Sequence, residues 1–254
     1  EFPQVRDCFN KSSKDFNGRT NLLFEGLSDN TETSVLSNGL YGVKKALLST
    51  LSGVYLYKGR KMTESMNEEL LKDLKPGDIA ATGKDGPLTN ALLGGQWTHG
   101  VMYVGDKKQW KKNFDKDEKT KNYYKNQCEK FRLKCDNFTG WLEKRYPKKY
   151  KEFSTNPNFN VIEALSDGVI FSEGKKSLRT NRLVTVKPTS LTELERAQVV
   201  ESAFSTVGQD YNFNFNARSN FSRVCTGITA ILAEKVKDKN GNPVVFRQSQ
   251  ILGD

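Results

Sequence analysis

Short apolar runs bounded by turn residues occur at several places along the chain, and this pattern predicts β-strands. A Pro-Gly turn leads into a predicted strand at residues 78–82, and the run THGVMYVGD at 98–106 predicts a second strand. Two apolar runs within 159–171 predict a strand, a turn and another strand. Pro188 ends a further predicted strand at 182–188, because proline cannot donate a ladder hydrogen bond.

Other segments show the spacing of amphipathic helices. The clearest is 190–208, where Thr192 and Glu195 fit a capping box and Gly208 fits a C-terminal cap. Residues 86–95 predict a short helix that ends on glycines, and the apolar positions 228, 231 and 232 predict a helix at 225–236. Apolar residues between 40 and 54 recur every three or four positions. That helix packs on the main domain or, as an alternative, lies on a membrane surface.

Together these elements predict an α+β protein, with a small antiparallel sheet packed on helices. We expect residues 1–70 to form a polar helical extension and residues 71–254 to form the main domain. Residues 107–152 show no strand pattern, so we expect a helical insertion there, made of two helices broken near the sequence CDNFTG.

Positive charge is concentrated in this insertion. The 254-residue chain has a formal net charge of +10, and residues 107–152 contain 16 Lys and Arg against 7 Asp and Glu, with aromatic residues interleaved. The insertion is either a solvated helical pair whose aromatics form its seam, or a surface for an anionic polymer or membrane. Lys dominates over Arg and no DNA- or RNA-binding motif occurs, which argues against a nucleic-acid partner.

The cellular location of the protein is predicted from the first residues of the chain and from the length of its apolar runs. No run reaches the roughly 18–20 apolar residues of a membrane span. The chain begins without Met, which fits either a removed signal peptide or a cloning scar. We expect the former, and therefore a secreted or periplasmic protein of the cell envelope.

The four cysteines do not form a metal motif. There is no CxxC pair and only one histidine, so no Cys/His zinc set is expected. Cys128 and Cys135 are seven positions apart, which on a straight helix is about 10 Å and beyond disulfide reach. A bridge between them would need a break in the helix near 131–134. The disulfide state of these two residues and of Cys8 stays open.

Cys225, His99 and Glu163 are the candidate catalytic residues. Cys225 falls in the first turn of a predicted helix, where the backbone N–H groups and the helix dipole favour a thiolate. His99 could accept the thiol proton and return it to a leaving group. Glu163 lies among apolar residues and could orient the imidazole. The alternatives are a small core cysteine, a structural histidine and a glutamate that faces solvent.

Four motifs then add a family resemblance. KPGDIA, THGVMYVGD, VIEALSDGV and GQDYNFNF with VCTGITAIL, in this order, resemble the circularly permuted papain-like amidases of the YiiX/YaeF group. These amidases are relatives of NlpC-type cell-wall peptidases and of lecithin–retinol acyltransferase. The resemblance covers about residues 74–106 and 159–236. It implies a permuted papain-like fold, with Cys225 as nucleophile, His99 as base and Glu163 as the third residue. Thr226 stands where members often have Ser.

The resemblance implies acyl transfer that uses no metal or organic cofactor. Cys225 would attack an amide carbonyl, with Tyr211 and Thr226 beside the substrate and its oxyanion. The expected substrate is a cell-wall peptide such as that of peptidoglycan. Two alternatives remain: a lipid acyltransferase or thioesterase with the same thiol, and a non-catalytic module that binds an anionic surface through residues 107–152.

Overall fold

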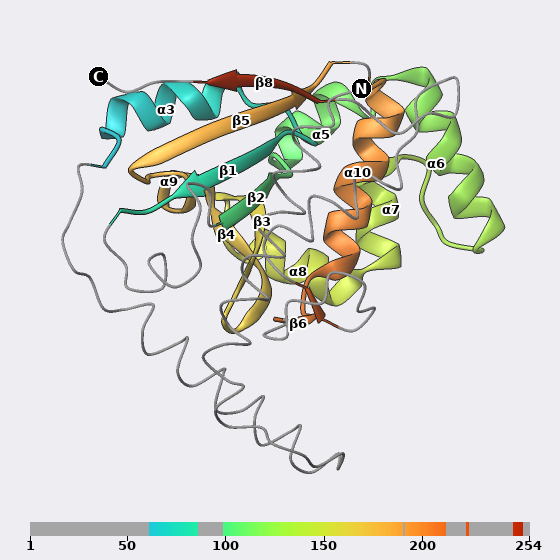
Figure 1. The fold of residues 1–254 in the computed structure, drawn as a ribbon. Helices are drawn as coiled ribbons and strands as arrows, with labels where there is room; N and C mark the ends of the chain where they lie inside the picture. The colour runs from blue at the N-terminus through green and yellow to red at the C-terminus, as the bar shows by residue number, and fades with distance from the viewer. Residues whose placement is uncertain (1–60, 86–98, 190, 212–221, 224–245, 251–254) are drawn as a thin grey trace, which may run out of the picture.

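An antiparallel sheet organises the protein. The computed structural model describes residues 61–85, 99–189, 191–211, 222–223 and 246–250. Within them, six strands form one sheet in the order β4-β3-β2-β1-β5-β8, and every neighbouring pair is antiparallel (Figure 1). The strands are β1 (Ile79–Gly83), β2 (His99–Tyr103), β3 (Phe159–Leu165), β4 (Gly168–Glu173), β5 (Arg182–Pro188) and β8 (Phe246–Gln250). The predicted α+β class is confirmed, and β1 to β5 lie where the apolar runs predicted strands.

Helices cover both faces of this sheet. They are α3 (Glu64–Asp73), α5 (Lys107–Asn113), α6 (Glu118–Lys130), α7 (Phe138–Arg145), α8 (Pro147–Thr155), α9 (Gly174–Ser177) and α10 (Glu193–Thr206). Two short strands, β6 (Asp210–Tyr211) and β7 (Ser222–Arg223), pair in parallel beside the main sheet. The helices predicted at 40–54, 86–95 and 225–236 lie outside the described residues.

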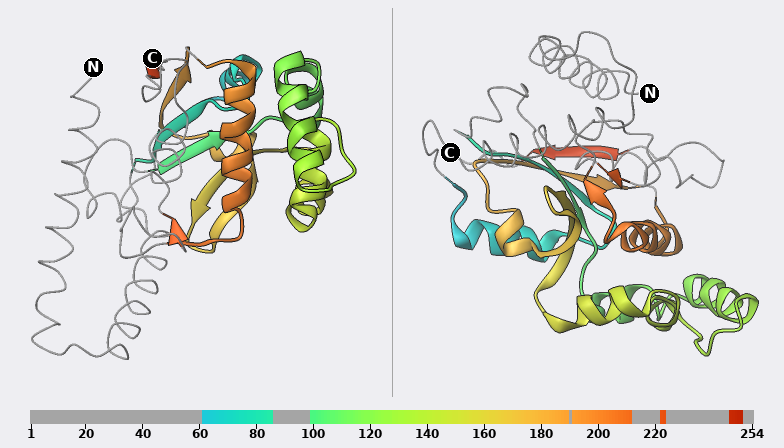
Figure 2. Two further views of the ribbon diagram at one scale, coloured as in Figure 1. Left: turned by 90° about the vertical axis from the view of Figure 1, so that its right-hand side faces the viewer. Right: turned by 90° about the horizontal axis from the view of Figure 1, so that it is seen from below.

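Side chains that alternate along the strands form two cores, one on each face. On one face, Val101 and Val161 pack with Leu70 of α3 and with Leu178, which follows α9. On the other face, Met102 belongs to a larger core that includes residues of α10 and of the insertion. Figure 2 shows α10 standing between the strands and the helical layer of the insertion. The insertion packs on α10 and also reaches the sheet, because the ring centroid of Phe153 in α8 lies 5.2 Å from that of Phe171 in β4.

Helix α3 spans the domain boundary that we expected at residue 70. Leu70 of α3 and Leu74, which follows the helix, are almost fully buried in the core beneath β1 and β2. Asn67 of the same helix donates a side-chain hydrogen bond to the backbone oxygen of Lys175 in α9. Helix α3 is thus packed on the sheet with the main domain, and residues 1–60 lie outside the described residues.

Helix α10 has the predicted caps. The Thr192 side chain accepts from the backbone N–H of Glu195, and the Glu195 carboxylate accepts from the backbone N–H of Thr192. Beyond the other end, Gly208 has a φ of 82°, a left-handed conformation that glycine adopts without a Cβ clash. The capping signals in the sequence therefore predicted both ends of this helix correctly.

A buried ion pair joins α10 to the turn before β1. Nη1 of Arg196 lies 2.9 Å from Oδ1 of Asp78, and both side chains are nearly inaccessible to solvent. The guanidinium also donates to the backbone oxygens of Pro76 and Pro188. The other carboxylate oxygen of Asp78 accepts from the backbone N–H of Lys75. Asp78 is therefore a structural residue of the Pro-Gly turn.

The insertion forms four helices, so the expectation of two helices is wrong. The additional breaks have local causes. Asp117 and Asn137 each accept a backbone N–H from the residue three positions on, and so begin α6 and α7. Pro147 stands in the first turn of α8, where its missing N–H is harmless, and α7 ends before it.

Most aromatic residues of the insertion form its packing seam. Trp110, Tyr124 and Phe138 are fully buried, and the ring of Trp110 stacks on that of Phe153 with centroids 4.7 Å apart. On α10, the Glu201 carboxylate accepts hydrogen bonds from three aromatic donors of the insertion, Tyr124 Oη, Trp141 Nε1 and Tyr146 Oη. These rings hold the insertion on α10, and the buried ones are unavailable for stacking on a ligand.

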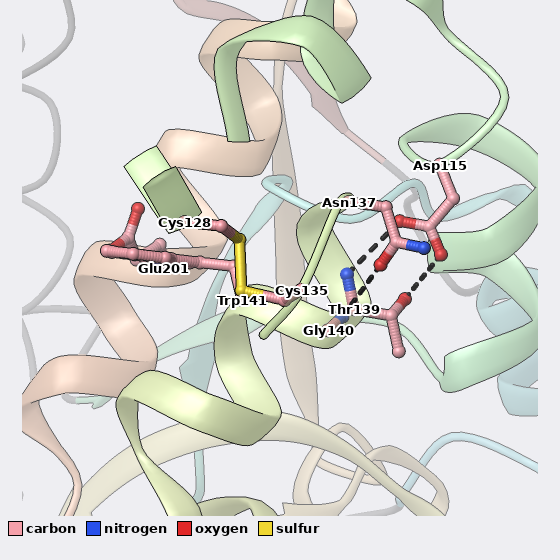
Figure 3. Close-up of a disulfide and its surroundings, with 8 residues drawn as sticks. All are labelled: Asp115, Cys128, Cys135, Asn137, Thr139, Gly140, Trp141 and Glu201. Atoms are coloured by element: carbon pink, nitrogen blue, oxygen red, sulfur yellow. Dashed lines mark hydrogen bonds between the residues drawn. A yellow bond between two sulfur atoms is a disulfide. The ribbon is translucent and has the colours of Figure 1, made fainter. Parts of the chain in front are cut away.

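A disulfide joins Cys128 and Cys135 across the loop between α6 and α7, with Cα atoms 5.6 Å apart (Figure 3). This is possible because α6 ends at Lys130. The backbone N–H of Leu133 bonds the oxygen of Cys128, and that of Arg132 bonds the oxygen of Glu129, which together form a Schellman motif. The helix break that the sequence required for a bridge therefore exists.

Candidate active site

His99 and Glu163 form the candidate site on neighbouring strands. His99 opens β2, and Glu163 lies on β3, where it pairs with Val101 across the antiparallel ladder. Residues two apart on a strand share a face, so His99 and Glu163 lie on the same face of the sheet. Nε2 of His99 is 2.7 Å from Oε2 of Glu163, and their side chains are 20% and 6% exposed. The two residues that the sequence suggested as base and orienting carboxylate are thus in direct contact.

Glu163 has further partners that keep it ionised. Its second carboxylate oxygen, Oε1, accepts a hydrogen bond of 2.6 Å from Oγ of Ser177 in α9. Burial by itself would raise the pKa of Glu163, but hydrogen bonds and attraction from His99, with hydrogen bonds from Ser172 and Ser177, lower the pKa to about 2. Near neutral pH this buried side chain is therefore a carboxylate and only accepts hydrogen bonds.

The charge state of Glu163 determines which nitrogen of His99 carries a proton. Because the carboxylate accepts, Nε2 of His99 must be the donor in their 2.7 Å hydrogen bond. In the neutral ring the other nitrogen, Nδ1, is then the basic one. The pair accordingly presents an imidazole whose tautomer and orientation are set by a carboxylate, as a general base requires.

Ser177 and Ser172 are site residues that the sequence analysis missed. Ser177 follows β4 on the four-residue helix α9, which lies near β3. Nothing in the periodicity of SEGKKS distinguishes a serine that reaches a carboxylate 14 residues earlier from one that faces solvent. Only the path of the chain after β4 brings this hydroxyl to Glu163.

Thr82 adds a buried hydroxyl beside His99. Its Cα is the cross-strand partner of the His99 Cα in the pairing of β1 with β2. Directly opposite residues in such a ladder have Cβ atoms about 5 Å apart. Thr82 is 1% exposed, and its Oγ1 has no hydrogen-bond partner within the part of the chain that the structure describes.

The remaining predicted site residues are placed only in part. Tyr211 ends β6, where its backbone pairs with that of Arg223 in β7. Cys225 and Thr226 lie outside the described residues, and their roles stay predictions. The nearest described residue to the predicted nucleophile along the chain is therefore Arg223.

Strands β6 and β7 lie beside β4, which is the edge strand of the main sheet and the neighbour of β3. The backbone of Val169 in β4 exchanges two hydrogen bonds of 2.8 Å with Gly208 and Gln209, just before β6. Val169 in turn pairs with Ala164, the residue after Glu163. Gly208 and Gln209, which precede Cys225 along the chain, therefore lie beside the strand pair that holds Glu163.

The described residues lack both a metal-binding cluster and a membrane-spanning helix. They contain no group of three or more His, Cys, Asp and Glu side chains placed to hold a metal ion. In the same part of the chain, none of the helices combines the length and the apolar character needed to cross a bilayer.

No protein-family model, curated protein or solved structure matches this chain. The resemblance to permuted papain-like amidases therefore stays a prediction, and the functional argument below rests on the geometry of His99 and Glu163.

Proposed function

We propose that this protein is a cysteine hydrolase that cleaves an amide bond through a thiol acyl-enzyme, with Cys225, His99 and Glu163 as its catalytic set. The observation that carries the proposal is the 2.7 Å contact between His99 and a buried, ionised Glu163. Burying a carboxylate is costly unless it is paired, and here the pairing orients the only imidazole of the chain.

The path of the chain supports Cys225 as the nucleophile. Cys225 follows Arg223 by two residues, and two residues of extended chain span at most about 7 Å. Arg223 lies in β7, next to β4 and so one strand away from β3. Of the four cysteines, Cys128 and Cys135 are oxidised to a disulfide, which leaves Cys8 and Cys225 as candidates for a reactive thiol.

In the proposed reaction the thiol of Cys225 gives its proton to Nδ1 of His99, and the sulfur attacks the amide carbonyl carbon. The C–N bond breaks as His99 returns the proton to the leaving amine, and a thioester remains. Water, deprotonated by the same ring, then attacks the thioester and releases the acid and the free thiol. Glu163 stays ionised and holds the ring, while Tyr211 and Thr226 contact the substrate or its oxyanion. The mechanism uses no cofactor.

The proposed substrate is a cell-wall peptide, and the proposed fold is the permuted papain-like one, in which the histidine strand precedes the cysteine helix. Two observations support a site of action in the cell envelope. The Cys128–Cys135 disulfide is typical of oxidising compartments. The insertion also carries a large excess of Lys and Arg, which favours an anionic polymer as surroundings.

Alkylation kinetics test the catalytic set. At pH 7, Cys225 should react with iodoacetamide faster than Cys8, as measured by peptide mass spectrometry. His99→Ala should slow labelling of Cys225 by about tenfold or more, because an unassisted thiol is only a few per cent ionised at this pH. Labelling of Cys8 in the same sample is the internal control. Equally slow labelling of both thiols, unchanged by His99→Ala, would reject an enzymatic role.

A second experiment addresses the substrate. Purified peptidoglycan is incubated with the protein, and with Cys225→Ser as the control, and released peptides are identified by mass spectrometry. Peptides released only by the unaltered protein would support the proposal. Cys225-dependent turnover of acyl esters without peptide release would instead assign the thiol to a lipid acyltransferase or thioesterase. Binding without either activity would indicate a module for an anionic surface.

A further inference from the structure

The loop between α6 and α7 carries an exposed aromatic ring among cations. Phe131 is 45% exposed, more than any other large hydrophobic residue that the structure describes. The guanidinium carbon of Arg145 lies 5.1 Å from its ring centroid, and Nζ of Lys130 lies 5.8 Å from it. Arg132 and Lys134 follow on the loop and are exposed. We call Lys130, Phe131, Arg132, Lys134 and Arg145 the cationic tip.

The cationic tip is held rigidly and at the periphery. The edge of Phe131 packs on Trp141 with ring centroids 5.5 Å apart, and the Cys128–Cys135 disulfide closes the loop beneath it. Figure 2 shows this loop on the side of the helical layer away from the sheet. The tip therefore lies at the edge of the helical layer, on a loop that the disulfide closes.

Arg132 occupies a position where its backbone favours glycine. It is the residue after the helix cap in the Schellman motif and has a φ of 54°, the only positive φ of a non-glycine residue among those described. An arginine here destabilises the folded chain relative to glycine. Arg132 thus places a positive charge on the loop although its side chain makes the local backbone conformation less stable than glycine would.

We propose that the cationic tip docks the protein on the surface of an anionic lipid bilayer. Lys and Arg side chains are attracted to anionic headgroups, and an exposed ring between them can enter the boundary between headgroups and acyl chains. The acidic residues Glu129 and Asp136 flank the tip, so binding is weak and reversible. The inference is independent of the chemistry of Cys225.

The form of the tip favours a bilayer over a nucleic acid. Single strands are bound in grooves where several rings stack on successive bases. Here Trp110, Tyr124, Phe138 and Trp141 are buried in the protein, and Phe131 is the most exposed ring of the insertion. A flat surface that meets one ring and several cations at once matches this arrangement better.

Vesicle co-sedimentation of the full chain tests the proposal. The protein should bind phosphatidylcholine vesicles that contain phosphatidylglycerol, bind vesicles of phosphatidylcholine alone much more weakly, and dissociate at high salt. Arg132→Gly should weaken binding about fivefold, the effect of one cation near an anionic surface. The same variant should raise the melting temperature by about 2 °C, because glycine suits the left-handed position. Phe131→Ser should weaken binding about fivefold or more.

Two control variants separate the tip from general effects. Lys72→Gln removes an exposed lysine of α3. Leu165→Ser removes, at the end of β3, the second exposed large hydrophobic residue of the part of the chain that the structure describes. Both should bind vesicles within about twofold of the unaltered protein. Binding that Lys72→Gln weakens as much as Arg132→Gly would show that net charge alone acts, and would overturn the proposal. An absence of vesicle binding would also overturn the proposal. Displacement of the protein from vesicles by a single-stranded oligonucleotide would overturn it as well.

Discussion

The strength of the Glu163 contacts leads to a prediction about acid stability. Its environment lowers the pKa from an ordinary value of 4.5 to about 2, although burial by itself acts in the opposite direction. Because the folded state binds this proton less tightly than the unfolded state, the ionised carboxylate stabilises the fold above pH 4.5. That contribution is about 3 kcal/mol. It decreases as the pH falls toward 2, where the carboxylate becomes protonated in the folded state as well.

Glu163→Gln isolates this contribution. The amide has nearly the same shape but no charge and no titration, so the variant should be less stable at pH 5.5 by up to about 3 kcal/mol. Between pH 5.5 and pH 3 the difference in the free energy of unfolding between the two proteins should shrink by about 2 kcal/mol. Taking the difference between the two proteins cancels the other carboxyl groups.

Urea denaturation followed by circular dichroism at several pH values gives the required free energies. Glu152→Gln, which removes an exposed carboxylate of α8, is the control and should change stability by less than about 0.5 kcal/mol at every pH. A constant difference between Glu163→Gln and the unaltered protein from pH 5.5 to pH 3 would refute the reasoning. It would mean that the carboxylate is not held ionised by His99 and the two serines.

Four further predictions concern stability and are measured by urea denaturation. Replacing Cys128 and Cys135 by Ser should cost about 2 kcal/mol, since the disulfide closes a short loop with a sequence separation of 7, and a reductant should abolish the difference. Arg196→Met should cost about 3–5 kcal/mol because it leaves its carboxylate partner buried and unpaired, and a smaller loss would indicate that this charge reaches solvent. Gly105→Ala should cost about 2–4 kcal/mol, since φ is 72° and an added Cβ would lie 2.6 Å from a proline side chain. Gly208→Ala, where φ is 82° but nothing lies within 4 Å of the added carbon, should cost only about 1 kcal/mol.

The secondary structure was largely predictable because its signals are local. Strands β1 to β5 follow from apolar runs and turn residues, and α10 follows from the caps at Thr192 and Gly208. The insertion was predicted less well, although Asp117, Asn137 and Pro147 are themselves local stop and start signals. In a Lys-rich segment they are hard to tell from surface residues, because the apolar period is weak.

The sequence by itself determined strands β1 to β5 and the caps of α10, and it suggested the pairing of His99 with Glu163 as a hypothesis. Each depends on residue types and spacings within one segment or on neighbouring strands. Only the tertiary structure decided that Ser177 reaches Glu163, that Cys128 and Cys135 meet, and that Glu201 anchors the insertion. These contacts depend on how the backbone turns after β4 and after α6 and on which face α10 presents. The course of the backbone and the orientation of α10 are set by packing of the whole chain, and no periodic pattern in the sequence indicates them.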